Sequence, residues 1–350
     1  MDAIKSHPKL VDVARHAGVS PATVSRVLNN TAPVRADVRT RVHSSLTALG
    51  YKPAPSRSAV SFQGAIVLMI PDILNPFFTE IERGVQDEAD IVKTMLFLLD
   101  VAEDAQKEER FLHMLAGQPI SGIILCGSRL ASPDLAAACT RQRAPIVVLN
   151  RAIRHPNVSC IMVDLESATF RAARHLIDLK HTQIAYLSGP STSEPSLARR
   201  RGIEKALTEA GLSLRPELCV SSFPNVDGGF QAMSAVLALP FKERPTAVLA
   251  YNDIMALGIL HAIRAHHLRV PEDISVVGVD DIAMTTHTNP PLTTIAQPKY
   301  RMGRLAMQIL ERVMHGQPPP DNGYTLLESS LIVRESTALA PVNGAIPAMA

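Results

Sequence analysis

The stretch Leu10–Asn29, LVDVARHAGVSPATVSRVLN, decides how the rest of this chain is interpreted. Its apolar spacing predicts two short helices joined by a tight turn, the first over about Leu10–His16. Gly18 can take the positive φ that such a turn requires, without the steric strain that a Cβ would bring. Ser20 is an N-cap and Pro21 a first-turn proline, so together they begin the second helix. The stretch therefore predicts a helix-turn-helix, with an ordinary αα-hairpin on a globular surface as the alternative.

The second helix of this motif has one apolar face and one exposed face. Val24, Val27 and Leu28 share the apolar face. A third helix over Val34–Leu49 has apolar residues at matching intervals, and it would complete a small core. The exposed side of the second helix carries Pro21, Ala22, Ser25, Arg26 and Asn29. A helix-turn-helix offers this side to the major groove of DNA.

The formal net charge of +2 is divided unevenly along the 350 residues. Residues 1–60 contain nine Lys or Arg against three Asp, a net charge of +6, so the remaining residues carry −4. A basic segment on a mildly acidic body favours binding to the phosphate backbone of nucleic acid. Basic residues also occur on solvated helix faces that bind no nucleic acid. The charge therefore agrees with a DNA-binding motif but does not establish DNA binding by itself.

Cysteine usage and hydropathy indicate a reducing, aqueous compartment. The four cysteines form no CxxC pair, and Cys126 and Cys160 lie in or beside apolar runs that are typical of a core. Met1–Leu10 lacks the apolar centre of a signal peptide, and no apolar run approaches the ~20 residues needed to span a bilayer. We therefore expect a cytoplasmic protein that does not enter a membrane.

Beyond residue 64 the chain alternates short apolar runs with helical stretches. A first series of runs extends from Ala65–Ile70 to Ile146–Leu149, and a second extends from Cys160–Val163 to Ile274–Val279. Continuous apolar strands that alternate with helices predict parallel sheets covered on both faces. Two successive series predict a two-lobed α/β core with a ligand cleft between the lobes, at the carboxyl ends of the strands.

Six segments give the chain a resemblance to the LacI/GalR family of transcriptional regulators, from about Leu10 to Thr337. In family order they are DVARHAGVSPATVSRVLN at Asp12, IPDILNPFF at Ile70, HLIDLKHTQIAYLSGP at His175, PTAVLAYNDIMALG at Pro245, LRVPEDISVVGVDD at Leu268 and PPLTTIAQPKYRMG at Pro290. The resemblance implies a helix-turn-helix headpiece followed by a hinge and a core similar to periplasmic sugar-binding proteins.

The same resemblance sets expected boundaries for these parts. The headpiece is expected at 8–52, the hinge at 53–63, the core at 64–338 and a tail at 339–350. Within the core, the first lobe is expected at about 64–159 and 289–321. The second lobe is expected at about 160–288 and 322–338, with a last strand near Leu331–Val333.

In the headpiece, the resemblance assigns roles to individual side chains. Pro21, Ala22 and Arg26 occupy positions that reach bases in the family, and Arg suits a bidentate contact with a guanine edge. Pro21 and Ala22 can offer only apolar contact, for example to a thymine methyl group. The side chains better placed for phosphates are Ser20, Thr23, Ser25 and Asn29.

The hinge departs from the family pattern, an Ala-Arg-x-Leu-like run that forms a helix on DNA and inserts a leucine into the minor groove. Without a gap, Val60 falls at the leucine position; with the register shifted by one residue, Arg57 falls at the arginine position. Pro55 could begin a helix there but would not lie inside one. We expect a hinge with Arg57 and Val60 as its DNA contacts.

For a small-molecule effector, the resemblance implies eight cleft residues. They are Phe77, Phe78, Asn150, Arg151, Arg199, Phe223, Asn252 and Asp280. An aromatic face with Asn, Asp and Arg side chains suits a polyol, whose C–H face stacks while its hydroxyls exchange hydrogen bonds. A purely structural role is the alternative for several of them: a phenylalanine pair is usually core, Asn252 can cap a helix and Asp280 can pair internally. We expect a sugar or sugar acid, with a nucleobase or nucleoside as the alternative.

These features predict a repressor of a carbohydrate-utilisation operon, which binds double-stranded palindromic operator DNA as a homodimer. A dimer is expected because one headpiece reads only a half-site. The family dimerises through helices of the first lobe, which here correspond to Phe77–Ile91 and Tyr300–Met314.

An α/β enzyme and a solute-binding protein are the other function classes considered. The chain has no GxGxxG, GxxxxGK[ST] or HExxH motif, so we expect neither catalysis nor a cofactor or metal. Gly189-Pro190-Ser191-Thr192-Ser193 lacks the final glycine of a nucleophile elbow. A solute-binding protein is disfavoured by the basic headpiece and by the lack of a signal peptide.

Overall fold

The computed structural model describes residues 8–29, 34–51, 64–190 and 194–341. Its internal contacts divide the chain into two compact units, with the boundary between Ser61 and Phe62. The first unit contains the headpiece and the second contains the two-lobed core, and each is described by itself below. No helix within the described ranges is long and apolar enough to cross a membrane.

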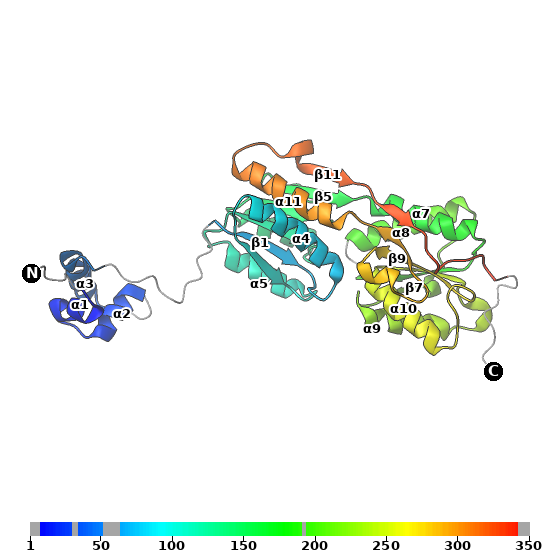
Figure 1. The fold of residues 1–350 in the computed structure, drawn as a ribbon, viewed down its shortest axis with the longest axis horizontal. Coiled ribbons are helices and arrows are strands. Elements are labelled where there is room, and N and C mark those ends of the chain that lie inside the picture. Colours follow the sequence, from blue (N-terminus) through cyan, green and yellow to red (C-terminus); the bar gives the residue numbers. More distant parts are fainter. Residues whose placement is uncertain (1–7, 30–33, 52–63, 191–193, 342–350) are drawn as a thin grey trace, which may run out of the picture. The chain divides into compact units, whose positions relative to one another are not determined.

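The headpiece is a three-helix unit (Figure 1), as the sequence predicts. Its helices are α1 (Leu10–Ala17), α2 (Pro21–Asn29) and α3 (Ala36–Leu49). Val13, Val24 and Val42, one from each helix, are fully buried and centre its small hydrophobic core. Gly18 has a φ of +63°, so the predicted left-handed turn between α1 and α2 is confirmed. The third helix begins at Ala36 rather than at the expected Val34.

The first lobe of the core contains a parallel sheet of six strands in the order β11-β5-β4-β3-β1-β2. The strands are β1 (Ile66–Ile70), β2 (Leu96–Asp100), β3 (Gly122–Cys126), β4 (Ile146–Leu149), β5 (Val158–Val163) and β11 (Tyr324–Leu327). Its helices are α4 (Pro76–Ile91), α5 (Ala105–Leu115), α6 (Ser132–Thr140) and α11 (Lys299–Met314). Residues of α4 and α11 pack on one face of the sheet, while α5 and α6 pack on the other (Figure 1).

The second lobe has the same construction, with strand order β12-β10-β9-β8-β6-β7. The strands are β6 (Ile184–Ser188), β7 (Cys219–Ser221), β8 (Ala247–Ala250), β9 (Ser275–Asp280), β10 (Thr293–Ala296) and β12 (Ser330–Ile332). All neighbours pair in parallel except β12, which is antiparallel to β10. The helices are α7 (Leu165–Asp178), α8 (Glu194–Glu209), α9 (Val226–Leu237) and α10 (Asp253–Ala265). Short 3-10 helices lie at Pro216–Leu218, Phe241–Glu243 and Ala283–Thr286, while a fourth, at Pro320–Gly323, packs against β5 and β11 of the first lobe.

Three strands fall on the other side of the expected lobe boundaries. β5 and β11 were expected in the second lobe, but they pair with each other and β5 pairs with β4, which places both in the first sheet. β10 was expected in the first lobe, but it pairs with β9 in the second sheet. The chain therefore crosses between the lobes after β5, after β10 and after β11. β12 covers most of the last strand expected near Leu331–Val333 and lies in the second lobe, as predicted.

Helices α4 and α11 approach each other closely enough to require glycine. A Cβ on Gly84 would lie 2.2 Å from the carbonyl oxygen of Tyr300, and one on Gly303 would lie 2.0 Å from that of Ile81. One turn after Gly84 on α4, the buried Glu88 carboxylate accepts a hydrogen bond from Arg304 Nε of α11 at 2.6 Å. The two helices are thus fixed against each other as one rigid pair of the first lobe.

Candidate functional site

The exposed side of α2 is the candidate DNA interface. Pro21, Ala22 and Arg26 are exposed, while Thr23 and Ser25 are half-buried beside them. The Oγ of Ser20 accepts a hydrogen bond from the backbone N–H of Thr23 at 3.2 Å, which caps the helix as predicted.

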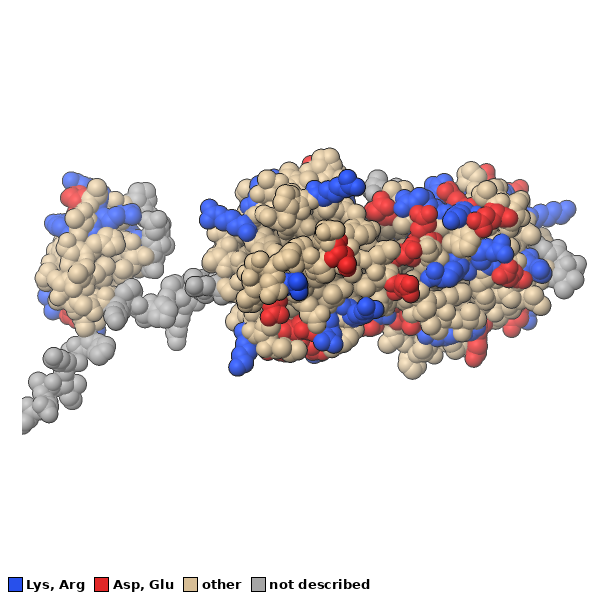
Figure 2. All heavy atoms as spheres, turned by 90° about the horizontal axis from the view of Figure 1, so that it is seen from above, with Lys and Arg blue, Asp and Glu red and all other residues tan. Residues whose placement is uncertain are grey.

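Three of the expected DNA contacts are beyond what the structure describes. Arg57, Val60 and the side chain of Asn29 lie outside the described residues. The charge of the described headpiece agrees with the expectation from the sequence, because Figure 2 shows basic side chains on its surface with few acidic ones among them.

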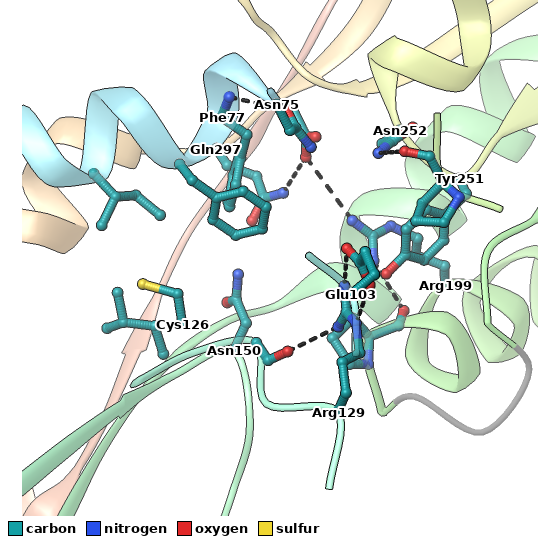
Figure 3. Close-up of a pocket in the computed structure, with 17 residues that line it drawn as sticks. Asn75, Phe77, Glu103, Cys126, Arg129, Asn150, Arg199, Tyr251, Asn252 and Gln297 are labelled. Carbon is teal, nitrogen blue, oxygen red and sulfur yellow. Dashed lines mark hydrogen bonds and ion pairs between the residues drawn. The ribbon is translucent and has the colours of Figure 1, made fainter. Parts of the chain in front are cut away.

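The candidate effector site is a cleft between the two lobes, at the carboxyl ends of their strands (Figure 3). Six of the eight expected residues line it: Phe77, Phe78, Asn150, Arg199, Asn252 and Asp280. The cleft contains about 510 Å³ of empty space, part of which is open to solvent.

Two expected residues, Arg151 and Phe223, lie outside the cleft lining. Arg151 turns toward the start of α6, where its Nη1 donates to the carbonyl oxygen of Ser128 at 2.9 Å and its Nη2 to Ser132 Oγ at 3.2 Å. Phe223 follows β7 and is 67% exposed. Position after a strand placed Arg151 at the cleft and the family resemblance placed Phe223 there, but neither argument fixed the direction of the side chain.

The aromatic wall of the cleft is positioned by the start of α4. Asn75 caps this helix, its Oδ1 accepting from the backbone N–H of Phe77 at 3.0 Å, and Pro76 occupies the first turn. Phe77 and Phe78 follow, with ring centroids 5.1 Å apart and an interplanar angle of 86°. Both rings line the cleft and both are more than nine-tenths buried, so they belong to the core and to the cleft at once.

Arg199, on α8, supplies the main positive charge of the second-lobe wall. It is 4% exposed, and its guanidinium lies over the ring of Tyr251, 4.4 Å from the centroid. Its Nη1 donates to the carbonyl oxygen of Pro195 at 3.2 Å, and its Nη2 lies 3.9 Å from Asp280 Oδ1. Its Nε has no hydrogen-bond partner among the described residues.

Asp280 ends β9 at the floor of the cleft. Gln297 Nε2 donates to its Oδ1 at 2.7 Å, and Lys299 Nζ donates to its backbone carbonyl at 2.6 Å. The pKa of Asp280 is raised to about 8, mainly by burial and further by the nearby Asp253 carboxylate, while Arg199 and Lys299 oppose the rise. Burial likewise raises the pKa of Asp253 to about 6, against the hydrogen bond from Thr294.

Asn252 has the capping role that was left open as its alternative. It precedes α10, and its Oδ1 accepts from the backbone N–H of Met255 at 2.9 Å. Its Nδ2 donates to the carbonyl oxygen of Pro224 at 3.3 Å. Asn252 lines the cleft, but its amide is already engaged on both sides.

Several cleft residues were not predicted from the sequence. They are Asn75, Glu103, Arg129, Tyr251 and Gln297. Glu103, Arg129, Tyr251 and Gln297 each follow a strand within a few residues, so a search of every strand end would have found these four. Within the described ranges, no three His, Cys, Asp or Glu side chains are grouped to hold a metal ion.

Comparison with known proteins identifies the two units. Residues 9–54 match the model of bacterial regulatory proteins of the lacI family, and residues 173–337 match a periplasmic binding protein-like domain. The chain is 36% identical over 332 residues to the HTH-type transcriptional repressor CytR of Escherichia coli K12, covering 94% of this chain and 96% of that one. The chain belongs to the LacI family.

Solved structures agree with this assignment. The structure resembles the lac repressor dimer bound to operator and the anti-inducer ONPF, with a TM-score of 0.69, 30% identity, and coverage of 95% of this chain and 100% of that one. It also resembles the transcriptional regulator CelR in complex with cellobiose, with a TM-score of 0.70, 31% identity and coverage of 94% and 99%. This LacI-family protein is therefore a transcriptional repressor with a helix-turn-helix headpiece and a two-sheet core.

Proposed function

We propose that this LacI-family repressor acts in the cytoplasm and binds a palindromic operator as a homodimer, and that an effector in the interlobe cleft changes its operator affinity. The effector is a sugar or sugar acid of the pathway whose operon is repressed. The convergence of aromatic and hydrogen-bonding side chains from both lobes at one cleft carries the proposal. Such a site can bind a ligand more tightly in one lobe arrangement than in another, which is what a ligand switch requires.

The chemistry of the cleft suits a ligand with an apolar face and many hydroxyls. Phe77 offers a flat face for C–H groups, Gln297 lies beside it with a polar amide, and Arg199 adds polar atoms to the lining of the same cleft (Figure 3). Asn150 turns one end of its amide inward, where its Oδ1 accepts from the backbone N–H of Val163 at 3.3 Å, so its Nδ2 remains to donate to a ligand.

Lys299 supports coupling between the cleft and the first-lobe helices. It begins α11 and is 5% exposed, and its Nζ donates to the carbonyl oxygens of Asp280 and Asp281 in the second lobe, each at 2.6 Å. The same Nζ lies 3.5 Å from Glu80 Oε1 on α4. A change in lobe closure would therefore displace the start of α11 and, with it, the rigid α4–α11 pair.

The α4–α11 pair is also the expected dimer surface. Ile91, at the end of α4, is 68% exposed, and Met95, which follows it, is 62% exposed. Tyr300 of α11 is 42% exposed, and its hydroxyl donates to Asp87 Oδ2 on α4 at 2.8 Å. Large exposed apolar side chains on the helices that respond to lobe closure favour a partner subunit at this surface.

A DNA-binding titration tests the proposal. An operator is first selected from random duplexes, and its affinity for the full-length protein is measured by fluorescence anisotropy at several salt concentrations. We expect palindromic selected sites, a steep salt dependence, and a tenfold or larger change in affinity with one member of a sugar and sugar-acid panel. A protein that binds no duplex DNA at low salt overturns the proposal and favours a solute-binding function.

A nucleobase or nucleoside is the second candidate effector. The edge-to-face pair Phe77–Phe78 presents an aromatic surface on which a planar base could pack as readily as a sugar ring. A parallel panel of nucleobases and nucleosides, titrated against the same operator complex, distinguishes the two effector classes.

A further inference from the structure

A second arginine–carboxylate pair, Glu103 with Arg129, lines the same cleft as Arg199 and Asp280. Glu103 follows β2 and Arg129 follows β3, so both come from loops at the carboxyl edge of the first sheet. Arg129 Nε and Nη2 both donate to the Glu103 carboxylate, the second at 2.7 Å. Arg129 Nη1 donates to the carbonyl oxygen of Gly127 at 2.8 Å. The two side chains are only 10% and 13% exposed, and Figure 3 shows them together at the cleft wall.

The backbone around this pair is held in place from several directions. The backbone N–H of Arg129 donates to Oε2 of the buried Glu108 at 2.8 Å, and that of Glu103 donates to the carbonyl oxygen of Pro71 at 2.7 Å. Ala102 and Glu103 both have left-handed backbone conformations, with φ of 52° and 59°. Such strain in residues other than glycine gathers at ligand sites, where the surrounding structure imposes it.

Two other side chains of the cleft leave one donor and one acceptor without a partner among the described residues. Arg199 Nε is a buried donor and Gln297 Oε1 a buried acceptor, and neither has a partner among the described residues. Both side chains are 4% exposed and both line the cleft. Buried polar groups are rarely left unpaired, so a ligand is expected to complete them. A hydroxyl group can both accept and donate, whereas a carboxylate or phosphate can only accept.

Glu103 makes the first-lobe wall unfavourable for an anion. Its carboxylate neutralises Arg129 through a bidentate contact, so an anionic ligand would gain no charge attraction from Arg129 and would face the Glu103 carboxylate itself. A hydroxyl could donate to Glu103, and a neighbouring hydroxyl could accept from an Arg129 N–H that Glu103 and Gly127 leave unused. The ligand chemistry that fits is a vicinal diol on a neutral molecule.

We propose that Glu103 and Arg129 contact the effector and select a neutral diol over its anionic analogue. This inference rests on the proposed function, in which the effector occupies this cleft, and it narrows that function to a neutral ligand. The diol belongs either to a free sugar or to the ribose of a nucleoside, and the probes below distinguish these sources.

The test measures binding of matched neutral and anionic probes to the full-length protein by calorimetry. The pairs are glucose with glucuronate, ribose with ribose 5-phosphate, and uridine with its 5′-monophosphate. For the pair that binds, we expect the native protein to prefer the neutral member at least tenfold. Glu103→Gln leaves the charge of Arg129 unpaired and should reduce that preference at least tenfold.

Two further variants separate selectivity from folding. Glu103→Asp keeps the negative charge and should retain the preference for the neutral probe. Glu204→Gln removes a carboxylate that is paired with Arg200 on the exposed face of α8, and it should leave the preference unchanged. A ratio of two affinities within one protein is insensitive to a general loss of stability.

Each outcome decides between the two proposals. Tighter binding of the anionic probe by the native protein, or an unchanged preference in Glu103→Gln, overturns the role of this pair but leaves the effector cleft in place. A protein that binds no member of any pair, with operator affinity unaffected by all of them, counts against both the pair and the proposed function.

Discussion

Replacement of Lys299 by methionine is the sharpest test of how the two lobes are held together. Methionine fills similar volume but removes the ammonium group, which leaves the carbonyl oxygens of Asp280 and Asp281 without their donor. The ion pair with Glu80 is also lost. The variant therefore isolates the polar contribution of one buried side chain that touches both lobes.

The expected loss follows from these contacts. A hydrogen bond from an ionised donor contributes about 1.5–3 kcal/mol, and Lys299 makes two of them to backbone carbonyls. The Glu80 side chain is 43% exposed, so its ion pair adds at most about 1 kcal/mol. The desolvation of the ammonium group opposes these gains. The net loss should be about 2–4 kcal/mol in the free energy of unfolding.

Urea unfolding at neutral pH measures this loss. The matched control is Lys242→Met, because the Lys242 side chain is exposed in the same unit and its removal should change stability by less than about 0.5 kcal/mol. Lys299→Met should also weaken the effect of a bound ligand on operator affinity. If the two lysine variants unfold at the same urea concentration, the cross-lobe contacts of Lys299 contribute nothing and the reasoning is refuted.

Three further predictions concern the headpiece, the helix pair and the cleft floor. Arg26→Ala should weaken operator binding by about 1–3 kcal/mol and relax specificity at one base pair, as measured with single-base operator variants; equal weakening on all sequences would indicate a phosphate contact. Gly84→Ala should destabilise the core by about 1–3 kcal/mol, because its Cβ meets the Tyr300 carbonyl, whereas Gly117→Ala has open space and should be nearly neutral in thermal unfolding. Because the pKa of Asp280 is raised in the folded protein, the folded state holds a proton that the unfolded state releases above about pH 4. The contribution of Asp280 to stability should therefore fall as pH rises from about 4 to 8, and Asp280→Asn should remove that contribution; identical pH profiles for variant and native protein would contradict it.

The headpiece was predictable because its determinants are local. The turn glycine, the serine cap, the first-turn proline and the apolar positions of α1 and α2 all lie within twenty residues, and each acts on its nearest neighbours. The strands β1 to β6, β8 and β9 were predicted for a similar reason, since each is a short apolar run bounded by turn residues; β10 and β11 were not predicted as strands. Strand β7, with only three residues and partial exposure, lacked that signal.

The candidate site was predictable only in part. Nearby sequence determines where a strand ends, whereas contacts with distant residues determine the direction of a side chain. Phe77 and Asp280 lie at helix and strand ends that face the cleft, as expected. Arg151 occupies a comparable place but is drawn away by Ser128 and Ser132. The pairing of Glu103 at the cleft could not be predicted from its own position, because its partner Arg129 is 26 residues away in the sequence.

The sequence by itself determined that this chain has a DNA-binding headpiece and a two-lobed α/β core, since both follow from periodicity, capping and apolar runs. Tertiary structure decided which lobe each late strand joins, because β10 and β11 are assigned by the strands beside which they pair. It also decided the charge of the cleft. A carboxylate neutralises a guanidinium only when the fold brings the two groups into contact. The distance between them cannot be calculated from their separation in the sequence.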